Sequence, residues 1–168
     1  EVHQKLLDPR RQLVKRCSEL ALIVVLLPAL ILLSLIIAIW IKKDSPGPVL
    51  YCQKRIGLDG KDIYIWKFRT MVENADGALQ ECLANDPDLR AEWEENHKLV
   101  CDPRITRVGR ILRKTSLDEL PQLWNVLRGD LSLVGPRPIV WDEVDKYQGG
   151  FALYKKVKPG LKIGRAHV

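Results

Sequence analysis

Two adjacent acids, Asp118 and Glu119, lie in a segment rich in groups suited to phosphate chemistry. Ser116 with Glu119 three residues later fits a capping box, which predicts a helix that begins between Ser116 and Asp118. Both acids would then lie in the first helical turn, where the dipole and free N–H groups favour an ionised carboxylate and a nearby phosphate. Such an aspartate can bind a divalent metal or attack phosphorus. The alternative is that both acids only cap the helix, as in most isolated capping boxes.

Basic residues that could bind phosphate occur in three other segments. Lys67 and Arg69 alternate on a predicted strand and therefore project from one face. Arg137 lies between two prolines, which would hold its guanidinium fork on a rigid backbone. A short helix predicted after Thr106 would carry a stripe formed by Arg104, Arg107, Arg110 and Arg113. The alternative is a solvated basic surface, and no aromatic residues interleave with these arginines as they do in many nucleic-acid binders.

Composition restricts the classes of protein that can present these groups. The chain has 168 residues, 46% hydrophobic and 29% charged, which suits about one folded domain and excludes a disordered tail. Its net charge of +6 favours anionic partners such as phosphates or an acidic membrane face. Residues 73–97 are acidic, so the rest of the chain is even more basic. The four cysteines are scattered, which favours reduced thiols and a cytosolic face.

One segment, Leu20–Ile41, carries no charge over 22 residues and predicts a membrane helix. Basic residues flank it on both sides, at Lys15 and Arg16 and again at Lys42 and Lys43. A spanning helix normally leaves such an excess on one side only, so two basic flanks favour a segment that dips in and returns. Pro28 predicts a bend. A kinked spanning helix is the alternative, and the residues alone give the two topologies even odds.

The polar part of the chain is predicted to contain a β-hairpin and several short helices. Strands over 49–54 and 62–70 flank the turn signal Asp59-Gly60, with Tyr64, Trp66 and Phe68 facing the core. Helices are predicted over 73–83, 88–99 and 106–114, and a buried strand over 131–134. We therefore expect an α/β (α+β) protein with two parts. Residues 1–45 would form a basic juxtamembrane helix and the membrane segment, and residues 46–168 the polar domain.

Taken together, these motifs resemble the bacterial sugar transferases, the monotopic polyprenyl-phosphate phosphoglycosyl transferases. The matching segments occur in the family's order and are Lys15-Arg16, Ser45-Pro46-Gly47-Pro48-Val49, Gln53-Lys54-Arg55-Ile56-Gly57, Lys67-Phe68-Arg69-Thr70-Met71, Asp102-Pro103-Arg104-Ile105-Thr106, Leu112-Arg113-Lys114-Thr115-Ser116-Leu117-Asp118-Glu119-Leu120-Pro121-Gln122, Gly135-Pro136-Arg137-Pro138 and Lys158-Pro159-Gly160. The long helical insert is most similar to that of the undecaprenyl-phosphate galactose phosphotransferases.

The resemblance implies transfer of a hexose 1-phosphate, with galactose favoured over glucose, from a UDP-sugar to undecaprenyl phosphate. UMP would leave, Mg²⁺ would assist, and the product would enter surface polysaccharide synthesis. Asp118 would be the nucleophile that forms a phosphosugar-aspartyl intermediate, and Glu119 would support the metal or handle protons. The resemblance also implies phosphate contacts from a set of four basic residues, Lys67, Arg69, Arg113 and Arg137.

It further implies a re-entrant membrane helix broken at Pro28 and an active site on the cytoplasmic face of the bacterial inner membrane. The expected partners are UDP-hexose, undecaprenyl phosphate and an anionic bilayer, without nucleic acid, and the sequence allows a homo-oligomer. The alternative function is a non-catalytic, membrane-tethered module that binds anions or acts as a scaffold.

Three departures from the family pattern stand out. Leu27 replaces the serine that often precedes the proline of the break, and Glu19 replaces an aspartate. The segment after residue 160 lacks the family's Thr-Gly and Gly-Arg residues, so we expect an altered or truncated end there. The chain also opens at Glu1 without methionine, which is expected for a piece of a longer protein with further membrane helices upstream.

Overall fold

A computed structural model describes residues 9–96, 99–147 and 150–163. The altered end expected after residue 160 therefore lies mostly outside the described residues. The chain divides into two compact units, each assembled from separate stretches of sequence. The first unit comprises residues 1–34, 52–67 and 119–168, and the second comprises residues 35–51 and 68–118. Cys17, Cys52, Cys82 and Cys101 are free, as predicted.

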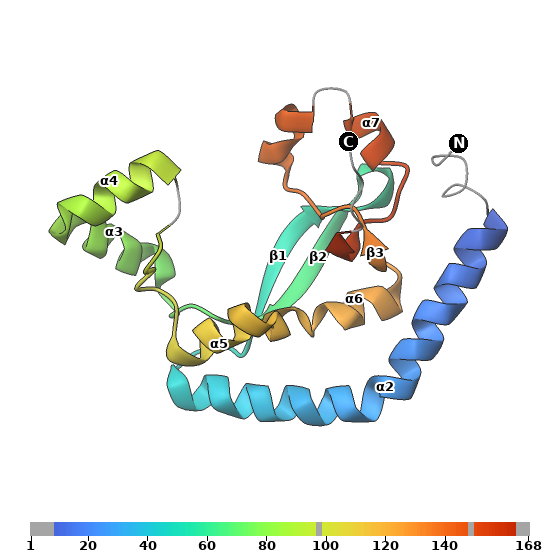
Figure 1. Cartoon of the computed structure of the whole chain (residues 1–168), viewed down its shortest axis with the longest axis horizontal. Coiled ribbons are helices and arrows are strands. Elements are labelled where there is room, and N and C mark those ends of the chain that lie inside the picture. Colours follow the sequence, from blue (N-terminus) through green and yellow to red (C-terminus); the bar gives the residue numbers. More distant parts are fainter. Residues whose placement is uncertain (1–8, 97–98, 148–149, 164–168) are drawn as a thin grey trace. The chain divides into compact units, whose positions relative to one another are not determined.

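The apolar run forms part of one long helix, α2 (Pro9–Asp44), which bends partway along its length (Figure 1). Pro28 lies inside the helix, where it cannot donate a backbone hydrogen bond, and this is the usual cause of such a bend. Residues 12–44 are long and apolar enough to cross a membrane. Leu22, Val25 and Leu32 leave 52–77% of their surface exposed, which water disfavours and lipid accepts. This helix is therefore the membrane-associated element.

In the first unit, the polar beginning of α2 is tied to the folded domain. Arg16 donates through Nη1 to the carbonyl of Val126 at 2.5 Å and through Nη2 to that of Leu127 at 3.0 Å. Glu19 is only 7% exposed, and it accepts hydrogen bonds from the Ser132 hydroxyl and the Leu133 amide at 2.6 and 3.2 Å. Glu19 Oε1 thus joins α2 to β3 (Ser132–Gly135) through two hydrogen bonds.

The hairpin has the predicted form, with β1 (Leu50–Ile56) and β2 (Asp62–Phe68) paired in a two-stranded sheet. Asp59 and Gly60 have positive φ angles of 58° and 75°, which Asp and Gly adopt more readily than most residues. The prediction that the aromatic face is core holds for Phe68, which is 5% exposed, and is wrong for Tyr64, which is 57% exposed. Ile65, on the opposite face, is only 3% exposed.

The core of the first unit explains why Ile65 is buried. Ile65 packs with three residues that are also almost completely buried, namely Ile23 of α2, Val126 and Leu131. Val126 belongs to α6 (Gln122–Arg128), so α2 and α6 both cover the Ile65 face of β2. Burying these apolar side chains contributes about 1.5–3 kcal/mol each.

A second, parallel pair of strands follows α6, formed by β3 (Ser132–Gly135) and β4 (Gly160–Ile163). The backbones approach closely where Gly135 and Gly160 meet, since a Cβ on Gly160 would lie 2.0 Å from the Gly135 nitrogen. The turn Trp141–Tyr147 and helix α7 (Phe151–Tyr154) lie between these strands in sequence. Tyr154 is buried and donates through its hydroxyl to the carbonyl of Ile56 at 2.7 Å, which ties α7 to β1.

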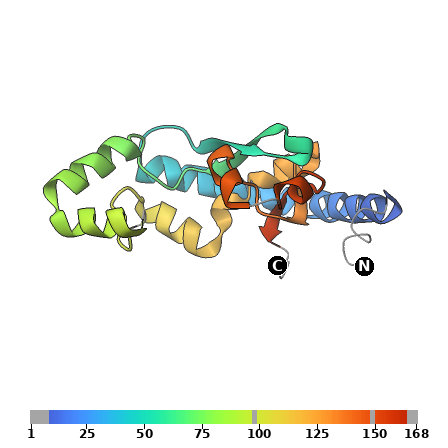
Figure 2. The same cartoon turned by 90° about the horizontal axis from the view of Figure 1, so that it is seen from above.

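The second unit contains the predicted helices. Helices α3 (Ala75–Asn85) and α4 (Pro87–Asn96) pack against each other as a helical hairpin (Figures 1 and 2). Helix α5 (Arg107–Thr115) begins after Thr106, whose hydroxyl accepts from the Gly109 amide at 2.9 Å, as predicted. Asp44, the last residue of α2, accepts from the Val108 amide at 2.9 Å and adds a second cap to the same helix.

Candidate active site

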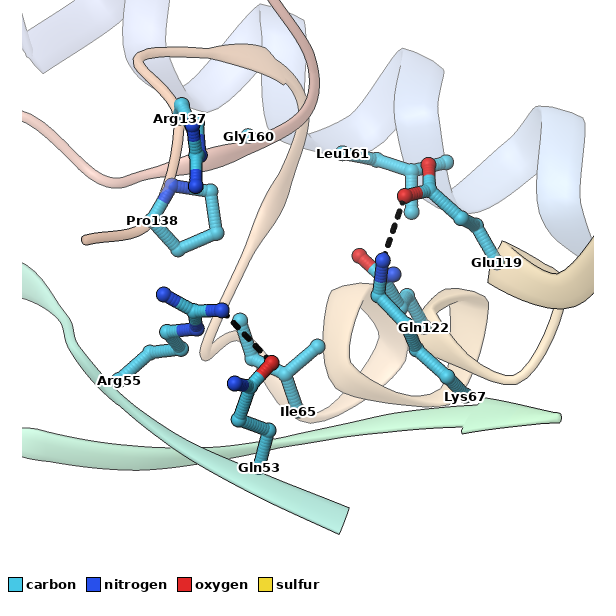
Figure 3. Close-up of a pocket in the computed structure, with 10 residues that line it drawn as sticks. All are labelled: Gln53, Arg55, Ile65, Lys67, Glu119, Gln122, Arg137, Pro138, Gly160 and Leu161. Carbon is cyan, nitrogen blue, oxygen red and sulfur yellow. Dashed lines mark hydrogen bonds and ion pairs between the residues drawn. The ribbon is translucent and has the colours of Figure 1, made fainter. Parts of the chain in front are cut away.

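The first unit contains a cavity of about 490 Å³ that gathers several of the predicted site residues (Figure 3). Its walls come from both hairpin strands, the turn before α6, the proline-flanked segment after β3 and the start of β4. The lining residues are Gln53, Arg55, Ile65, Lys67, Glu119, Gln122, Arg137, Pro138, Gly160 and Leu161. Three residues predicted from sequence, at positions 67, 119 and 137, therefore line one cavity.

On one side of the cavity, Lys67 of β2 contacts Glu119 (Figure 3). The Lys67 Nζ lies 2.8 Å from Glu119 Oε1, and the two side chains are 33% and 35% exposed. Gln122, the first residue of α6, lines the same side and is 3% exposed. This side therefore presents a carboxylate, which can bind a cation, and an ammonium and an amide, which can bind an anion.

On the other side of the cavity lie two arginines, Arg55 and Arg137, with Pro138 between them (Figure 3). Gln53 Oε1 accepts a hydrogen bond from Arg55 Nη2 at 2.6 Å. Glu143, in the turn Trp141–Tyr147, lies 3.9 Å from Arg55 Nη1 and 3.3 Å from Arg137 Nη2. The planar guanidinium fork suits phosphate oxygens, so this side can bind a phosphate or diphosphate.

Sequence reasoning assigned no role to Arg55, Gln53, Gln122 or Glu143. Gln53 and Arg55 alternate on β1, so the period of a strand places them on one face, and this signal could have identified them. No comparable signal exists for Glu143. Its proximity to Arg137 depends on the path of the chain after Pro138.

The capping-box prediction is wrong. Ser116 is not the N-cap of a helix but ends α5 in a left-handed conformation, with a φ angle of 57°. Asp118 and Glu119 lie in a single 3-10 turn, Leu117–Glu119, and α6 begins only at Gln122. Glu119 Oε1 accepts a hydrogen bond from the Lys67 ammonium at 2.8 Å. Asp118 belongs to the second unit, and Glu119 to the first.

Two further predicted phosphate ligands, Arg69 and Arg113, belong to the second unit. Arg69 is 7% exposed and donates to the backbone carbonyls of Ser45 and Pro46, and also to the Ser45 hydroxyl. Arg113 donates through Nε to the Thr70 hydroxyl at 2.8 Å. Both side chains thus have a structural partner, and their contact with phosphate stays a prediction.

The predicted stripe of four arginines is shorter than expected. Arg104 precedes α5 and binds Asp102 through two nitrogens, with the shortest distance 2.7 Å from Nη2 to Oδ2. Its guanidinium also lies 5.3 Å from the centre of the Trp93 ring. The Arg104 side chain holds the pKa of the Asp102 carboxyl below its usual range, mainly through the hydrogen bond. Arg104 is therefore a structural residue, and Arg107, Arg110 and Arg113 make up the helical stripe.

Asp118 and Glu119 could hold a magnesium ion only if phosphate oxygens of a substrate supplied further ligands. Within residues 9–96, 99–147 and 150–163, no group of three or more histidine, cysteine or acidic side chains could hold a metal. Mg²⁺ is commonly bound by one or two carboxylates plus substrate phosphates and water, and Glu119 offers one such carboxylate at the cavity. The donor set therefore fits an ion shared between the protein and a phosphate ligand.

Comparisons with known proteins identify several relatives of this chain. Residues 10–168 match the family model for the bacterial sugar transferases. The chain is 56% identical over 128 residues to an undecaprenyl-phosphate galactose phosphotransferase of Salmonella typhimurium, which covers 76% of this chain and 27% of that protein. It is 49% identical over 144 residues to a UDP-galactose-lipid carrier transferase of Erwinia amylovora, which covers 86% of this chain and 29% of that protein.

A relative named for glucose is also similar. The UDP-glucose:undecaprenyl-phosphate glucose-1-phosphate transferase of Escherichia coli is 40% identical over 153 residues, covering 89% of this chain and 30% of that protein. The chain thus spans less than a third of the length of these three relatives. Because the family model matches nearly every residue, the chain belongs to the bacterial sugar transferase family.

Proposed function

We propose that the protein transfers a hexose 1-phosphate from a UDP-sugar to undecaprenyl phosphate and releases UMP. Galactose is the favoured hexose because two similar relatives are named for galactose, with glucose as the second choice. The observation that carries the proposal is the cavity in which Arg55 and Arg137 lie opposite the Lys67–Glu119 pair. Such a cavity is suited to a diphosphate that must be held, neutralised and cleaved.

The proposed reaction has two displacement steps at one phosphorus atom. First, a carboxylate oxygen of Asp118 forms a bond to the phosphorus that carries the sugar, and the bond from that phosphorus to the bridging oxygen breaks. UMP leaves with both electrons of that bond. Second, an oxygen of the lipid phosphate attacks the same phosphorus and releases the Asp118 carboxylate. This order lets two bulky substrates use one site in turn.

The basic residues would make the first step feasible. A carboxylate is repelled by an anionic diphosphate unless the diphosphate charge is neutralised. Arg137 and Lys67 would contact phosphate oxygens, and Glu119 would keep Lys67 oriented toward them. A magnesium ion held by Glu119, Asp118 and the phosphates would supply further charge neutralisation when bound.

The acceptor suits the membrane-associated helix. Undecaprenyl phosphate keeps its chain in the lipid and its phosphate at the surface, and the polar start of α2 is tied to the first unit through Arg16 and Glu19. We propose that α2 enters the cytoplasmic leaflet, bends at Pro28 and returns to the same side. Both of its ends and the site would then face the cytoplasm of a bacterial inner membrane. Basic residues on both flanks of the apolar run support this topology.

The proposal is tested by measuring UMP release from UDP-galactose, UDP-glucose and UDP-N-acetylgalactosamine by the full chain in detergent or lipid nanodiscs with Mg²⁺. We expect multiple turnovers only when undecaprenyl phosphate is present, fastest with UDP-galactose, and a lipid-linked sugar diphosphate as product. A chain that binds vesicles and phosphate but releases no UMP from any donor would instead be an anion-binding scaffold.

A further inference from the structure

Glu143 contacts both arginines of the candidate active site, and neither the sequence nor the comparisons assign it a role. We propose that Glu143 is a positioning residue that holds Arg55 and Arg137 together as a clamp for the diphosphate of the donor. The diphosphate part of this proposal rests on the proposed function. The clamp itself rests on the geometry of three side chains.

The carboxylate of Glu143 is divided between the two arginines. Its Oε1 lies 3.3 Å from Arg137 Nη2, and its Oε2 lies 3.9 Å from Arg55 Nη1. The arginine side chains differ in exposure, 15% for Arg55 and 58% for Arg137. One side chain therefore links a nearly buried guanidinium on β1 to an exposed one after β3.

Glu143 is well placed to act as the fixed member of this group. Its backbone amide donates to the carbonyl of Val140 at 3.1 Å, and its Oε2 lies 3.4 Å from the Val140 amide. In the same turn, Trp141 donates through its indole nitrogen to Asp62 at 2.9 Å, which ties the turn to β2. The carboxylate is thus anchored to the backbone and the sheet.

The charges explain why the clamp needs a carboxylate. Two guanidinium groups on one side of a cavity repel each other, and Arg137 is exposed enough to turn away into water. Glu143 cancels one of the two charges and contacts one nitrogen of each fork. Gln53 contacts the other terminal nitrogen of Arg55 at 2.6 Å. The two forks are thereby held before an anion arrives, which reduces the ordering cost of binding.

Two variants separate positioning from simple charge. Glu143→Ala removes the carboxylate, whereas Glu143→Gln keeps an acceptor oxygen without the charge. The matched control is Asp145→Asn, which removes one negative charge from an exposed residue of the same turn. All variants are compared as the full chain in nanodiscs, by urea unfolding and by calorimetric binding of inorganic pyrophosphate and of UDP-galactose.

For a clamp, the dissociation constant for pyrophosphate should rise about tenfold in Glu143→Ala and about threefold in Glu143→Gln. Asp145→Asn should bind as the unaltered chain does, or slightly more tightly because a negative charge is lost. In UMP release, Glu143→Ala should raise KM for the UDP-sugar while kcat changes less than about threefold. A residue that only stabilised its turn would lower the urea midpoint in Glu143→Ala but would leave pyrophosphate binding and KM for the UDP-sugar unchanged.

The outcomes distinguish the two proposals. Unchanged or tighter pyrophosphate binding by Glu143→Ala would overturn the clamp, because a carboxylate that only competes with the ligand gives that result. Failure of the unaltered chain to bind pyrophosphate would overturn it as well. If the chain binds pyrophosphate through the clamp but releases no UMP from any donor, the clamp stands and the proposed function fails.

Discussion

Lys67 and Glu119, 52 positions apart in the sequence, form an ion pair of 2.8 Å that joins strand β2 to the turn before α6. Each side chain is about one third exposed, so water screens the pair and it contributes less than about 1 kcal/mol to folding. Both residues also line the cavity, so we expect the pair to act on a ligand there rather than to stabilise the fold.

That relationship yields a prediction for Lys67→Met and Glu119→Gln. Each substitution should lower UMP release at least about tenfold, because an anion-binding or metal-binding group is lost. The free energy of unfolding should change by less than about 1 kcal/mol. A double-mutant cycle by urea unfolding, run beside the activity assay, measures both. A large loss of stability with activity retained would make the pair structural.

Asp118→Asn should abolish the proposed covalent step. The amide keeps the size of the side chain but is a far weaker nucleophile, so transfer should fall by about three orders of magnitude or more. The matched control is Asp76→Asn, an exposed acid of the same unit that should retain transfer. Intact-protein mass spectrometry after rapid quenching should detect added hexose phosphate only when Asp118 is present. Retention of more than about a tenth of the activity by Asp118→Asn argues against the nucleophile.

Arg137→Lys preserves the charge of an exposed residue but removes the planar fork. We expect a rise in KM for the UDP-sugar of about tenfold, with little change in the urea midpoint, because the side chain is 58% exposed. Steady-state kinetics at fixed undecaprenyl phosphate measures this. Kinetics identical to those of the unaltered chain would remove Arg137 from the site.

The topology of α2 can be tested with single cysteines at positions 5 and 43 in a variant without the native cysteines. If α2 re-enters, a membrane-impermeant thiol reagent should label neither position in intact cells and both after the membrane is opened. Labelling of one position only in intact cells would establish a spanning helix. Pro28→Leu should shift the population toward that spanning form, because a straight apolar run of this length can cross the bilayer.

The Asp102–Arg104 pair predicts an acid limit to stability. Because Arg104 lowers the pKa of the Asp102 carboxyl in the folded chain, the pair stabilises the fold above the ordinary carboxyl pKa of about 4. That contribution is lost as pH falls through the lower folded pKa. The carboxylate is 8% exposed and hydrogen-bonded to a charged partner, so Asp102→Asn should cost about 1–2 kcal/mol near neutral pH. Urea unfolding from pH 7 to pH 3 should show this difference shrinking only below about pH 4.

Several parts of this protein followed from sequence alone because short-range physics decides them. Length and composition make the apolar run a membrane-associated helix, whatever else the chain does. Asp59-Gly60 lies in the turn between the two hairpin strands because these residues tolerate positive φ. Thr106 begins α5 because its hydroxyl reaches an amide three residues later.

Tertiary structure decided which side chains meet. Ser116 and Glu119 have the spacing of a capping box, yet Ser116 ends α5 and Glu119 contacts Lys67 instead. The exposure of Tyr64 and burial of Ile65 depend on which face of β2 is covered by α2 and α6, and local alternation is the same for either face. Glu143 reaches Arg55, 88 residues earlier, only because the turn after Pro138 packs beside the hairpin. Contacts at such separations depend on how the elements pack, which no local propensity specifies.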